Sequence, residues 1–388
     1  MSGVLLDLIL LKGKDMKIMA ILICIIILFS SCLRDNEYST GDKLTKENPE
    51  TDILTDKRAA IKHVGSIILQ EDNSQYIGVV WNLVESGGFF FIPDWISRDI
   101  KVYDKTGKFQ YIIGTIGEGP GEFRDVRGGM IVVGDTLYII DIILQRLNMF
   151  KTNGDFLKSF PLPSGLDYTG LSGELLAIGD AIVMPVYENK YAPMIEYHKS
   201  RTIALLDKQG NILRLFGKHP DEYSEYNMYM PGTSITLDTD GNIYQVSRAS
   251  PVIHKYNSEG DLIVRFGVVG KNFKPISFNY SPGMPIEEIE RLGLQVSSSS
   301  SVHWLPSRHI IHGYHNITEE SQSKRDPMYH ERFLQVYTDD GIYIPSDIPL
   351  PGVLLTVDED GLLYILTDHT PGNRVVDVYK LHIEITAE

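Results

Sequence analysis

The stretch SITLDTDGNIYQVSRASPVIHKYNSEGDLIVRFG, from Ser234 to Gly267, holds the pattern that decides the fold. Two apolar runs flank the turn DTDG, and two further runs flank the turn NSEG. Apolar and polar residues alternate within the runs, which is the period of a strand with one buried face. The stretch therefore predicts two consecutive β-hairpins.

The same pair of hairpins recurs along the chain. Six segments hold the third strand and the second turn: IKVYDKTGKF (100–109), LNMFKTNGDF (147–156), IALLDKQGNI (203–212), IHKYNSEGDL (253–262), LQVYTDDGIY (334–343) and VVDVYKLHIE (375–384). Six others hold the first hairpin: VESGGFFFI (84–92), VVGDTLYII (132–140), AIGDAIVMP (177–185), LDTDGNIYQ (237–245), LPSRHIIHG (305–313) and VDEDGLLYI (357–365). Five of the second turns carry a Gly where the hairpin needs a positive φ: Gly107, Gly154, Gly210, Gly260 and Gly341.

Repeats of roughly 40 to 50 residues are typical of propellers and solenoids. Because each copy has two hairpins, the six copies predict an all-β fold, a six-bladed β-propeller with four-stranded blades and few exposed strand edges. The sixth copy ends the chain at its third strand. We expect the earlier fragment IKHVGSIIL (Ile61–Leu69) to pair with the sixth copy and close the ring.

Two segments carry a resemblance to known proteins. Ser234–Gly267 resembles an NHL repeat, and GTIGEGPGEF (Gly114–Phe123) resembles the loop between blades of six-bladed propeller lipoproteins common in Bacteroides-like bacteria. The resemblance covers roughly residues 60 to 385 and implies an NHL-like propeller. It implies no particular reaction, because fold-level analogy does not supply one.

The N-terminus predicts export. Lys17 follows Met16, and the apolar run IMAILICIIILF (Ile18–Phe29) leads through two Ser residues to Cys32. A basic start, a short apolar run and small residues before a cleavage point are typical of a secretory signal, and the run is short for a membrane-spanning helix. The segment LFSSC resembles a lipobox, although Phe29 and Ser31 depart from its commonest residues, and this implies lipidation of Cys32.

These features predict three regions. Residues 1–31 are an upstream extension and a lipoprotein signal peptide with the true start at Met16, residues 32–58 are a polar, flexible tether, and residues 59–388 are the propeller. We expect an exported protein that is lipid-anchored in the cell envelope, at the outer membrane, and that contacts the membrane through the anchor only. Whether it faces the periplasm or the cell surface stays open.

The net charge of the chain limits the classes of partner that we expect it to bind. The formal net charge is −15, and no basic stripe interrupts the acidic chain. Since proteins that bind phosphate backbones are recognised by such a stripe, the composition excludes nucleic acid as the expected partner. Of the two Cys residues, Cys24 lies inside the signal, so the mature chain has no disulfide.

The loops at one end of the blades hold the candidate ligand-binding residues. GKHPDEYSEYNMYMPG (Gly217–Gly232) is rich in Tyr, which offers a broad contact surface at a low entropy cost. The candidates are Trp95, Arg124, Arg127, Tyr223, Tyr226, Tyr229 and Arg248. We expect a non-catalytic binding protein for a glycan, a peptide or a protein, while the alternative that the Tyr residues only cap the channel stays open.

An enzyme is the alternative function. The chain has no GxSxG or HExxH motif, so we expect no catalytic residue, metal or cofactor. Some propellers that resemble this chain are metal-dependent lyases or lactonases, and that resemblance implies a metal site at the channel mouth formed by Glu174, His254 and His303. The residues His309, His312 and His315 do not converge on a strand, because they alternate between its faces.

Three Asp and Arg pairs recur beside the loops that join second and third strands. The pairs are Asp94 with Arg98, Asp141 with Arg146, and Asp368 with Arg374. Since a structural bridge needs the same partners in each blade, we expect these pairs to be structural.

An insertion separates the fourth and fifth copies. PIEEIERLG (Pro285–Gly293) has Pro at a helix start, Glu in the first turn, and Ile286, Ile289 and Leu292 at three-residue spacing, so it predicts a short amphipathic helix. We expect this helix to bury its Ile residues against the propeller face as a lid. The run Ser297–Ser301 would be its flexible hinge.

Overall fold

The structure of this chain, a computed structural model, divides into two units, Met1–Thr45 and Lys46–Glu388. It describes residues 51–72, 76–171, 174–191, 194–226, 230–279 and 283–386. The predicted signal segment, the lipidation site at Cys32, most of the predicted tether, and Tyr229 lie outside these residues. Across the described ranges, no helix is long and apolar enough to cross a membrane.

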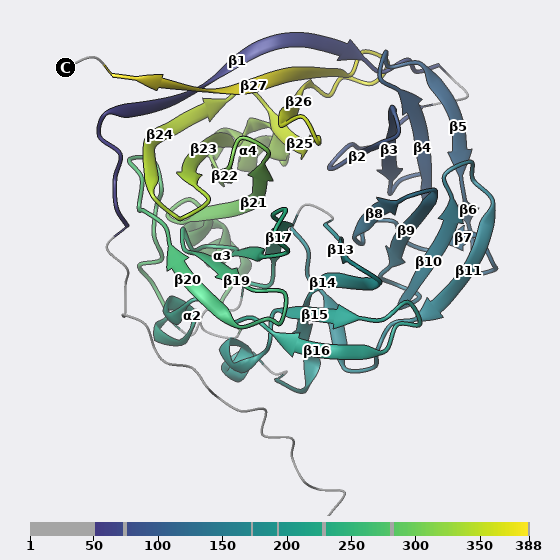
Figure 1. Cartoon of the computed structure of the whole chain (residues 1–388), viewed down its shortest axis with the longest axis horizontal. Helices are drawn as coiled ribbons and strands as arrows, with labels where there is room; N and C mark the ends of the chain where they lie inside the picture. The colour runs from purple at the N-terminus through teal and green to yellow at the C-terminus, as the bar shows by residue number, and fades with distance from the viewer. Residues whose placement is uncertain are drawn as a thin grey trace, which may run out of the picture. The chain divides into compact units, whose positions relative to one another are not determined.

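The second unit contains six antiparallel sheets arranged around an axis (Figure 1), so the predicted six-bladed propeller is confirmed. Blade 1 contains β2 (Val84–Ser86), β3 (Phe89–Asp94), β4 (Asp99–Asp104) and β5 (Phe109–Ile113). Blade 2 contains β8 (Met130–Val133), β9 (Thr136–Asp141), β10 (Arg146–Lys151) and β11 (Phe156–Pro161). Blade 3 contains β13 (Leu176–Ile178), β14 (Ala181–Glu188), β15 (Ile203–Leu206) and β16 (Ile212–Phe216), and β12 (Leu166–Tyr168) also pairs with β14.

The remaining blades follow the same order. Blade 4 contains β17 (Thr233–Leu237), β18 (Ile243–Ser247), β19 (Ile253–Tyr256) and β20 (Leu262–Phe266). Blade 5 contains β21 (Ser297–Leu305), β22 (His309–Asn316), β23 (Glu331–Thr338) and β24 (Tyr343–Leu350). Blade 6 contains β25 (Val353–Val357), β26 (Leu362–Asp368), β27 (Val375–Ile385) and β1 (Lys57–Ile68).

The ring closes between the two ends of the propeller sequence. β1 pairs antiparallel with β27 from Lys57 opposite Ile385 to Ile68 opposite Val375, and the two strands run together along the outside of blade 6 (Figure 1). The predicted pairing is therefore confirmed, although the strand begins four positions before the predicted Ile61. This closure leaves β27 without a free edge.

The hairpin turns have the geometry that the sequence predicted. The five Gly residues of the second turns all have a positive φ, between 80° and 98°. Asp side chains brace turns of both the first and the second hairpins by accepting hydrogen bonds from backbone N–H groups two and four residues later. The braced turns follow Asp104, Asp207, Asp238 and Asp358.

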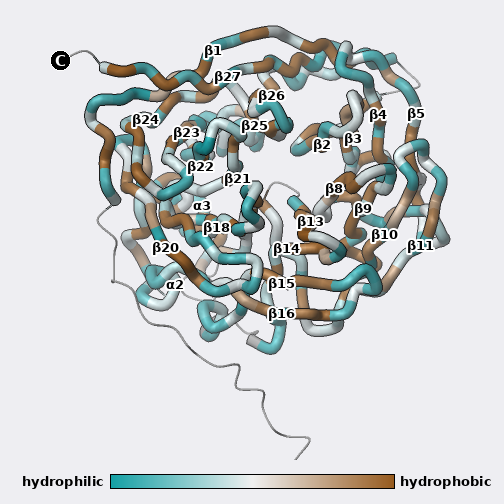
Figure 2. Tube along the Cα trace, viewed as in Figure 1, coloured by the Kyte–Doolittle hydropathy of each residue, from teal (hydrophilic) through white to brown (hydrophobic). Residues whose placement is uncertain are grey.

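The core lies between neighbouring blades. Six apolar clusters each join two adjacent blades, and successive residues of one strand face opposite neighbours: Phe90 packs toward blade 6, and Phe91 packs toward blade 2. The central strands are therefore buried on both faces, not on one as their alternation predicted. Figure 2 shows the resulting hydrophobic stretches along the strands and hydrophilic ones at many turns.

Two polar side chains inside the blades, Lys101 and His312, form ion pairs or hydrogen bonds there. Lys101 on β4 is buried and contacts Asp94 and Asp99 at 2.9 and 2.8 Å. His312 on β22 contacts Ser299 and Gln335 at 2.8 and 3.2 Å, and burial lowers its pKa to about 4. Both side chains therefore have polar partners in the interior of the blades.

The Ser run is not a hinge. Ser297–Ser301 opens β21, the innermost strand of blade 5, and its Ser297, Ser298, Ser299 and Ser301 side chains are buried. Ser299 donates a hydrogen bond to the carbonyl of Ser250 at 2.7 Å, which ties blade 5 to blade 4. The prediction was wrong because composition does not show which backbone groups a neighbouring strand will bond.

Candidate functional site

One end of the propeller carries the irregular structure. The segments before each first strand and those between each second and third strand lie at this end, because neighbouring strands are antiparallel. Its helical elements are η2 (Asn189–Tyr191), η3 (Met194–Lys199), α2 (Asp221–Glu225), α3 (Ile286–Gly293), α4 (Glu319–Lys324) and η4 (Pro327–Tyr329). We call this end the loop face.

Three neighbouring cavities open on the loop face. The aromatic cavity, of about 180 Å³, shares Trp81 and Leu171 with the central cavity, of about 300 Å³. The central cavity in turn shares Pro327 and His330 with the helical cavity between α3 and α4, of about 480 Å³. The shared walls place the central cavity between the other two.

The aromatic cavity contains a cation–aromatic pair. The Arg127 guanidinium carbon lies 5.1 Å from the centre of the Trp95 ring. Asp125 accepts a hydrogen bond from Arg127 Nε at 2.9 Å, so the guanidinium is held over the ring by its own ion pair. The neighbouring Trp81 is 41% exposed and presents a flat apolar face where this cavity joins the next.

The central cavity is lined by basic and neutral side chains. Arg248, Arg332, His315 and His330 contribute to its wall, which contains no Asp or Glu among the described residues. The two His rings are stacked, with centroids 4.6 Å apart and an angle of 12° between their planes. Burial, with a contribution from Arg332, lowers the pKa of His330 to about 4, so this ring is neutral near pH 7.

The helical cavity is mostly apolar. Its apolar walls are Met230, Phe278, Met284, Ile289, Leu292, Val296, Ile317 and Pro327. The predicted helix at 285–293 is confirmed as α3, and Leu292 is buried. The predicted burial of the Ile residues is wrong: Ile286 is 67% exposed and Ile289 is 42% exposed, because α3 turns its Ile stripe toward the solvent and the rim of the cavity.

The predicted ligand-binding residues are divided by the structure. Trp95 and Arg127 line the aromatic cavity and Arg248 lines the central one, whereas Arg124 forms an exposed ion pair with Glu118 at 3.3 Å and lines none of the three. Tyr226 is half-buried and also lines none of them.

Tyr223 is fully buried below the loop face, where its ring stacks on Tyr197 and His219. Its hydroxyl donates to the Met230 carbonyl at 3.2 Å. It belongs to a seventh apolar cluster, which supports the loops, and it is therefore not one of the residues that a ligand on the loop face could contact.

The residues of the alternative metal site do not form one. The residues that the structure describes include Glu174, His254 and His303, and they contain no group of three or more His, Cys, Asp or Glu that could hold a metal. Glu174 instead accepts a hydrogen bond from Ser234 at 2.5 Å. Burial lowers the pKa of His254 to about 3 and that of His303 to about 4. His309, His312 and His315 lie on β22, where His312 contacts Ser299 and Gln335 and the His315 ring stacks on His330.

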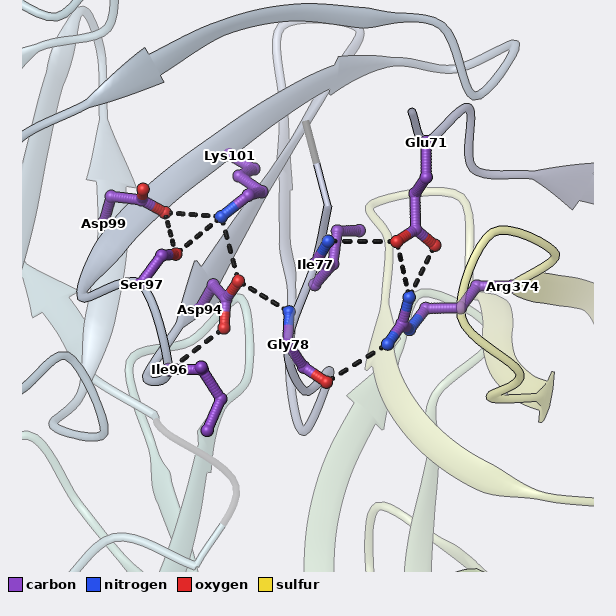
Figure 3. A network of polar contacts seen from close by, with 9 residues as sticks. All are labelled: Glu71, Ile77, Gly78, Asp94, Ile96, Ser97, Asp99, Lys101 and Arg374. Atoms are coloured by element: carbon purple, nitrogen blue, oxygen red, sulfur yellow. Dashed lines mark hydrogen bonds and ion pairs between the residues drawn. The ribbon is translucent and has the colours of Figure 1, made fainter. Parts of the chain in front are cut away.

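The predicted Asp and Arg pairs form no ion pairs with one another among the described residues, although the backbone N–H of Arg98 donates to the Asp94 carbonyl at 2.7 Å and Arg146 lies opposite Asp141 in the sheet. Asp94 accepts hydrogen bonds from Lys101 and from the backbone of Gly78 and Ile96. Burial alone would raise its pKa, but these hydrogen bonds outweigh burial and lower it. Arg374 makes two 2.6 Å contacts with Glu71 and donates to the Gly78 carbonyl (Figure 3).

The Asp141 and Arg146 side chains also bind backbone groups of a loop. Arg146 donates to the carbonyls of Glu118, Gly119 and Glu122, and the Asp141 carboxylate accepts from the backbone of Arg124. Each residue thus binds the loop between blades, since that backbone has polar groups left unpaired by the sheets.

Several residues of the cavities were not predicted. Trp81 precedes the first blade, His330 ends the long loop of blade 5 after α4, and Arg332 lies at the start of β23. The unusual length of that loop was a signal in the sequence, since the loops in blades 1, 2 and 4 are only a few residues long. Neither its fold against α3 nor the position of Trp81 could be derived from local patterns.

The closed ring of four-stranded blades defines the chain as a six-bladed β-propeller. A family model described as a 6-bladed beta-propeller, DUF5128, matches residues 51–244, and the chain belongs to this family. A search of curated proteins found no match.

Solved structures share the fold. A member of the DUF4221 family from Bacteroides vulgatus is 11% identical, with a TM-score of 0.64, over 85% of this chain and 99% of that one. A putative exported protein from Bacteroides fragilis is 13% identical, with a TM-score of 0.49, over 88% and 98%. A virginiamycin B lyase from Staphylococcus aureus reaches a TM-score of 0.41 at 11% identity, over 82% and 99%. At 11% identity, the similarity to the DUF4221 protein shows the fold alone. The TM-scores of the other two structures are below 0.5, so these similarities support no further conclusion.

Proposed function

We propose that this chain is a non-catalytic binding protein of the cell envelope whose loop face binds a peptide segment of a partner. The observation that carries this proposal is the row of three joined cavities with different chemistry: aromatic, cationic and apolar. An extended peptide presents its side chains at regular intervals, so separate pockets of different chemistry can read successive residues. Recognition also concentrates on loops that a rigid scaffold holds in place.

A glycan is the second candidate partner. The observation in its favour is Trp81, whose exposed ring lies where the aromatic and central cavities meet. A flat aromatic face suits a sugar ring as well as a peptide side chain. The large apolar helical cavity favours the peptide, because sugars bring many hydroxyl groups that an apolar wall leaves without hydrogen bonds.

Binding of peptides through this row is expected to depend on Trp81. With the full chain immobilised, a mixed library of synthetic nonapeptides and a panel of oligosaccharides would be passed over it and the retained molecules identified by mass spectrometry. Trp81→Ala should weaken peptide retention about tenfold or more, because an aromatic side chain at the centre of an interface commonly contributes 2 kcal/mol.

The control is Ile212→Ala on the outer strand β16, where the side chain is 41% exposed, as Trp81 is. This change should leave retention unaltered. Retention of oligosaccharides with no peptide would replace the peptide by the glycan, and equal losses in both variants would refute the loop-face site.

We further propose that the protein is exported and held in the outer membrane by a lipid on Cys32. The support is the sequence alone: the apolar run Ile18–Phe29 followed by a lipobox-like LFSSC. Cys32→Ser should move the protein from the membrane fraction to the soluble fraction, as measured by immunoblot after fractionation. Cys24→Ser, inside the run, is the control and should leave the membrane association unchanged. A Cys32→Ser protein that stays in the membrane fraction would exclude the lipid anchor.

A further inference from the structure

The central cavity has a charge that the chain as a whole does not. The protein carries a formal net charge of −15, yet two Arg side chains line this cavity beside two His rings whose pKa values are lowered by burial, and its described walls contain no acidic residue. Most buried or half-buried cations in proteins are paired with an anion. A cationic cavity in an acidic protein therefore suits an anionic ligand.

Arg248 is held in place and is still available. Its Nε donates to the Pro231 carbonyl at 3.0 Å, and its backbone N–H donates to the Gly232 carbonyl at 3.0 Å. In the part of the chain that the structure describes, its two terminal nitrogens have no hydrogen bond and no carboxylate within ion-pair distance. A guanidinium that is fixed through Nε and has both terminal nitrogens free is preorganised for a carboxylate.

Arg332 lines the same cavity, but its guanidinium binds backbone carbonyls of the cavity wall. Its terminal nitrogens donate to the carbonyls of Pro327, Met328 and His330, at 2.5 to 3.1 Å. These contacts hold η4 in place and with it the wall that the central and helical cavities share. Arg332 therefore positions this wall and adds positive charge, while Arg248 offers the free donors.

The helical cavity supplies an apolar volume directly beside this charge. Pro327 and His330 border both cavities, so the cationic cavity and the apolar one share a wall. Its volume of about 480 Å³ lies within the range of pockets that enclose small ligands, roughly 300 to 1,000 Å³. One ligand can reach both cavities if its anionic and apolar groups are close neighbours.

From this juxtaposition we infer that the loop face reads the C-terminus of a peptide, with the terminal carboxylate on Arg248 and the apolar side chain of the last residue between α3 and α4. This inference rests on the proposed peptide-binding function. The last residue is the only position in a peptide where a carboxylate and an apolar side chain are attached to the same carbon. A fatty acid has its carboxylate at the end of a long chain and would leave the aromatic cavity unused.

The test compares free acids with amides on the full chain. Nonapeptides with their last four positions randomised would be synthesised once as C-terminal acids and once as C-terminal amides, and retained peptides would be identified by mass spectrometry. The acids should be enriched in Leu, Ile, Met or Phe at the last position. The best acid should bind at least tenfold more tightly than its amide, measured by isothermal titration calorimetry.

Variants separate the two parts of the site. Arg248→Met should weaken the acid at least tenfold and leave the amide unchanged, and Ile289→Asp should remove the preference for an apolar last residue. Arg124→Met is the matched control, since this Arg lies on the loop face and lines none of the cavities. Thermal unfolding of each variant checks that the propeller is intact, and the comparison of acid with amide on the unaltered chain needs no variant.

Each result decides between the two proposals. Acids and amides retained equally would overturn the C-terminal inference and leave peptide binding standing. No peptide retained from either set would overturn both. Binding of dodecanoate that depends on Arg248, without any retained peptide, would assign the site to a fatty acid instead.

Discussion

Replacing Arg374 with Met is expected to lower the free energy of unfolding by about 3 to 5 kcal/mol. The guanidinium and the Glu71 carboxylate are both almost fully buried and lie 2.6 Å apart. Removing the cation leaves the carboxylate buried without its counter-charge, and this uncompensated charge causes most of the loss. The effect extends beyond the pair, because Glu71 also accepts from the backbone of Ile77 and Arg374 also donates to Gly78 (Figure 3).

Urea unfolding of the two proteins, followed by circular dichroism, measures this loss. The matched control is Arg308→Met, which breaks an ion pair with Asp339 in which the Arg side chain is mostly exposed, and it should cost less than about 1 kcal/mol. Adding Glu71→Gln to Arg374→Met should recover part of the loss, since the buried charge is then gone. Losses of the same size in Arg374→Met and Arg308→Met would show that the buried pair stabilises the protein no more than the exposed one.

Deleting β1, residues 57–68, is expected to open the propeller. β1 pairs with β27 along its whole length, and its Ala59, Ile61 and Ile67 pack against the clusters that blade 6 shares with its neighbours. Without β1 the strand β27 becomes an exposed edge with unpaired backbone groups, which favours association between chains. The midpoint of thermal unfolding should fall by about 10 °C or more, which corresponds to a loss of several kcal/mol for a domain of this size.

Calorimetry and light scattering measure the two consequences separately. A synthetic peptide with the sequence KRAAIKHVGSII (Lys57–Ile68), added to the shortened protein, should restore the midpoint, because it can pair with β27 from outside. A scrambled peptide of the same composition is the control and should have no effect. An unchanged midpoint and no association in the shortened protein would mean that β1 only covers the ring and does not close it.

Much of the propeller follows from local order in the sequence. The hairpins at 84–92 and 357–365 and the Gly turns at 107 and 341 lie where the pattern predicted them, because strand periodicity and a positive φ depend on nearby residues. Ring closure by β1 could also be predicted by counting the strands, since the sixth copy lacks one and β1 supplies it.

The structure separates the candidate ligand-binding residues by position. Trp95, Arg127 and Arg248 line cavities, whereas Tyr223 is buried and Arg124 lines none of the three. Position within a blade predicts which end of the propeller a residue occupies. It does not predict whether the side chain turns outward or packs into the loops below.

The sequence by itself determined the number of blades and the four strands of each, because the hairpins depend on contacts between residues close in the chain. It also determined the way the ring closes, because the repeat can be counted and one strand is missing from the last copy. The tertiary structure alone decided that Ser299 is buried, that Ile286 is exposed, that Arg374 pairs with Glu71, and that Trp81 meets Arg248 around one cavity. Each of these depends on segments far apart in the sequence that meet only after the blades have packed around the ring. Burial and electrostatics at such meetings depend on the distance in space, which no local pattern contains.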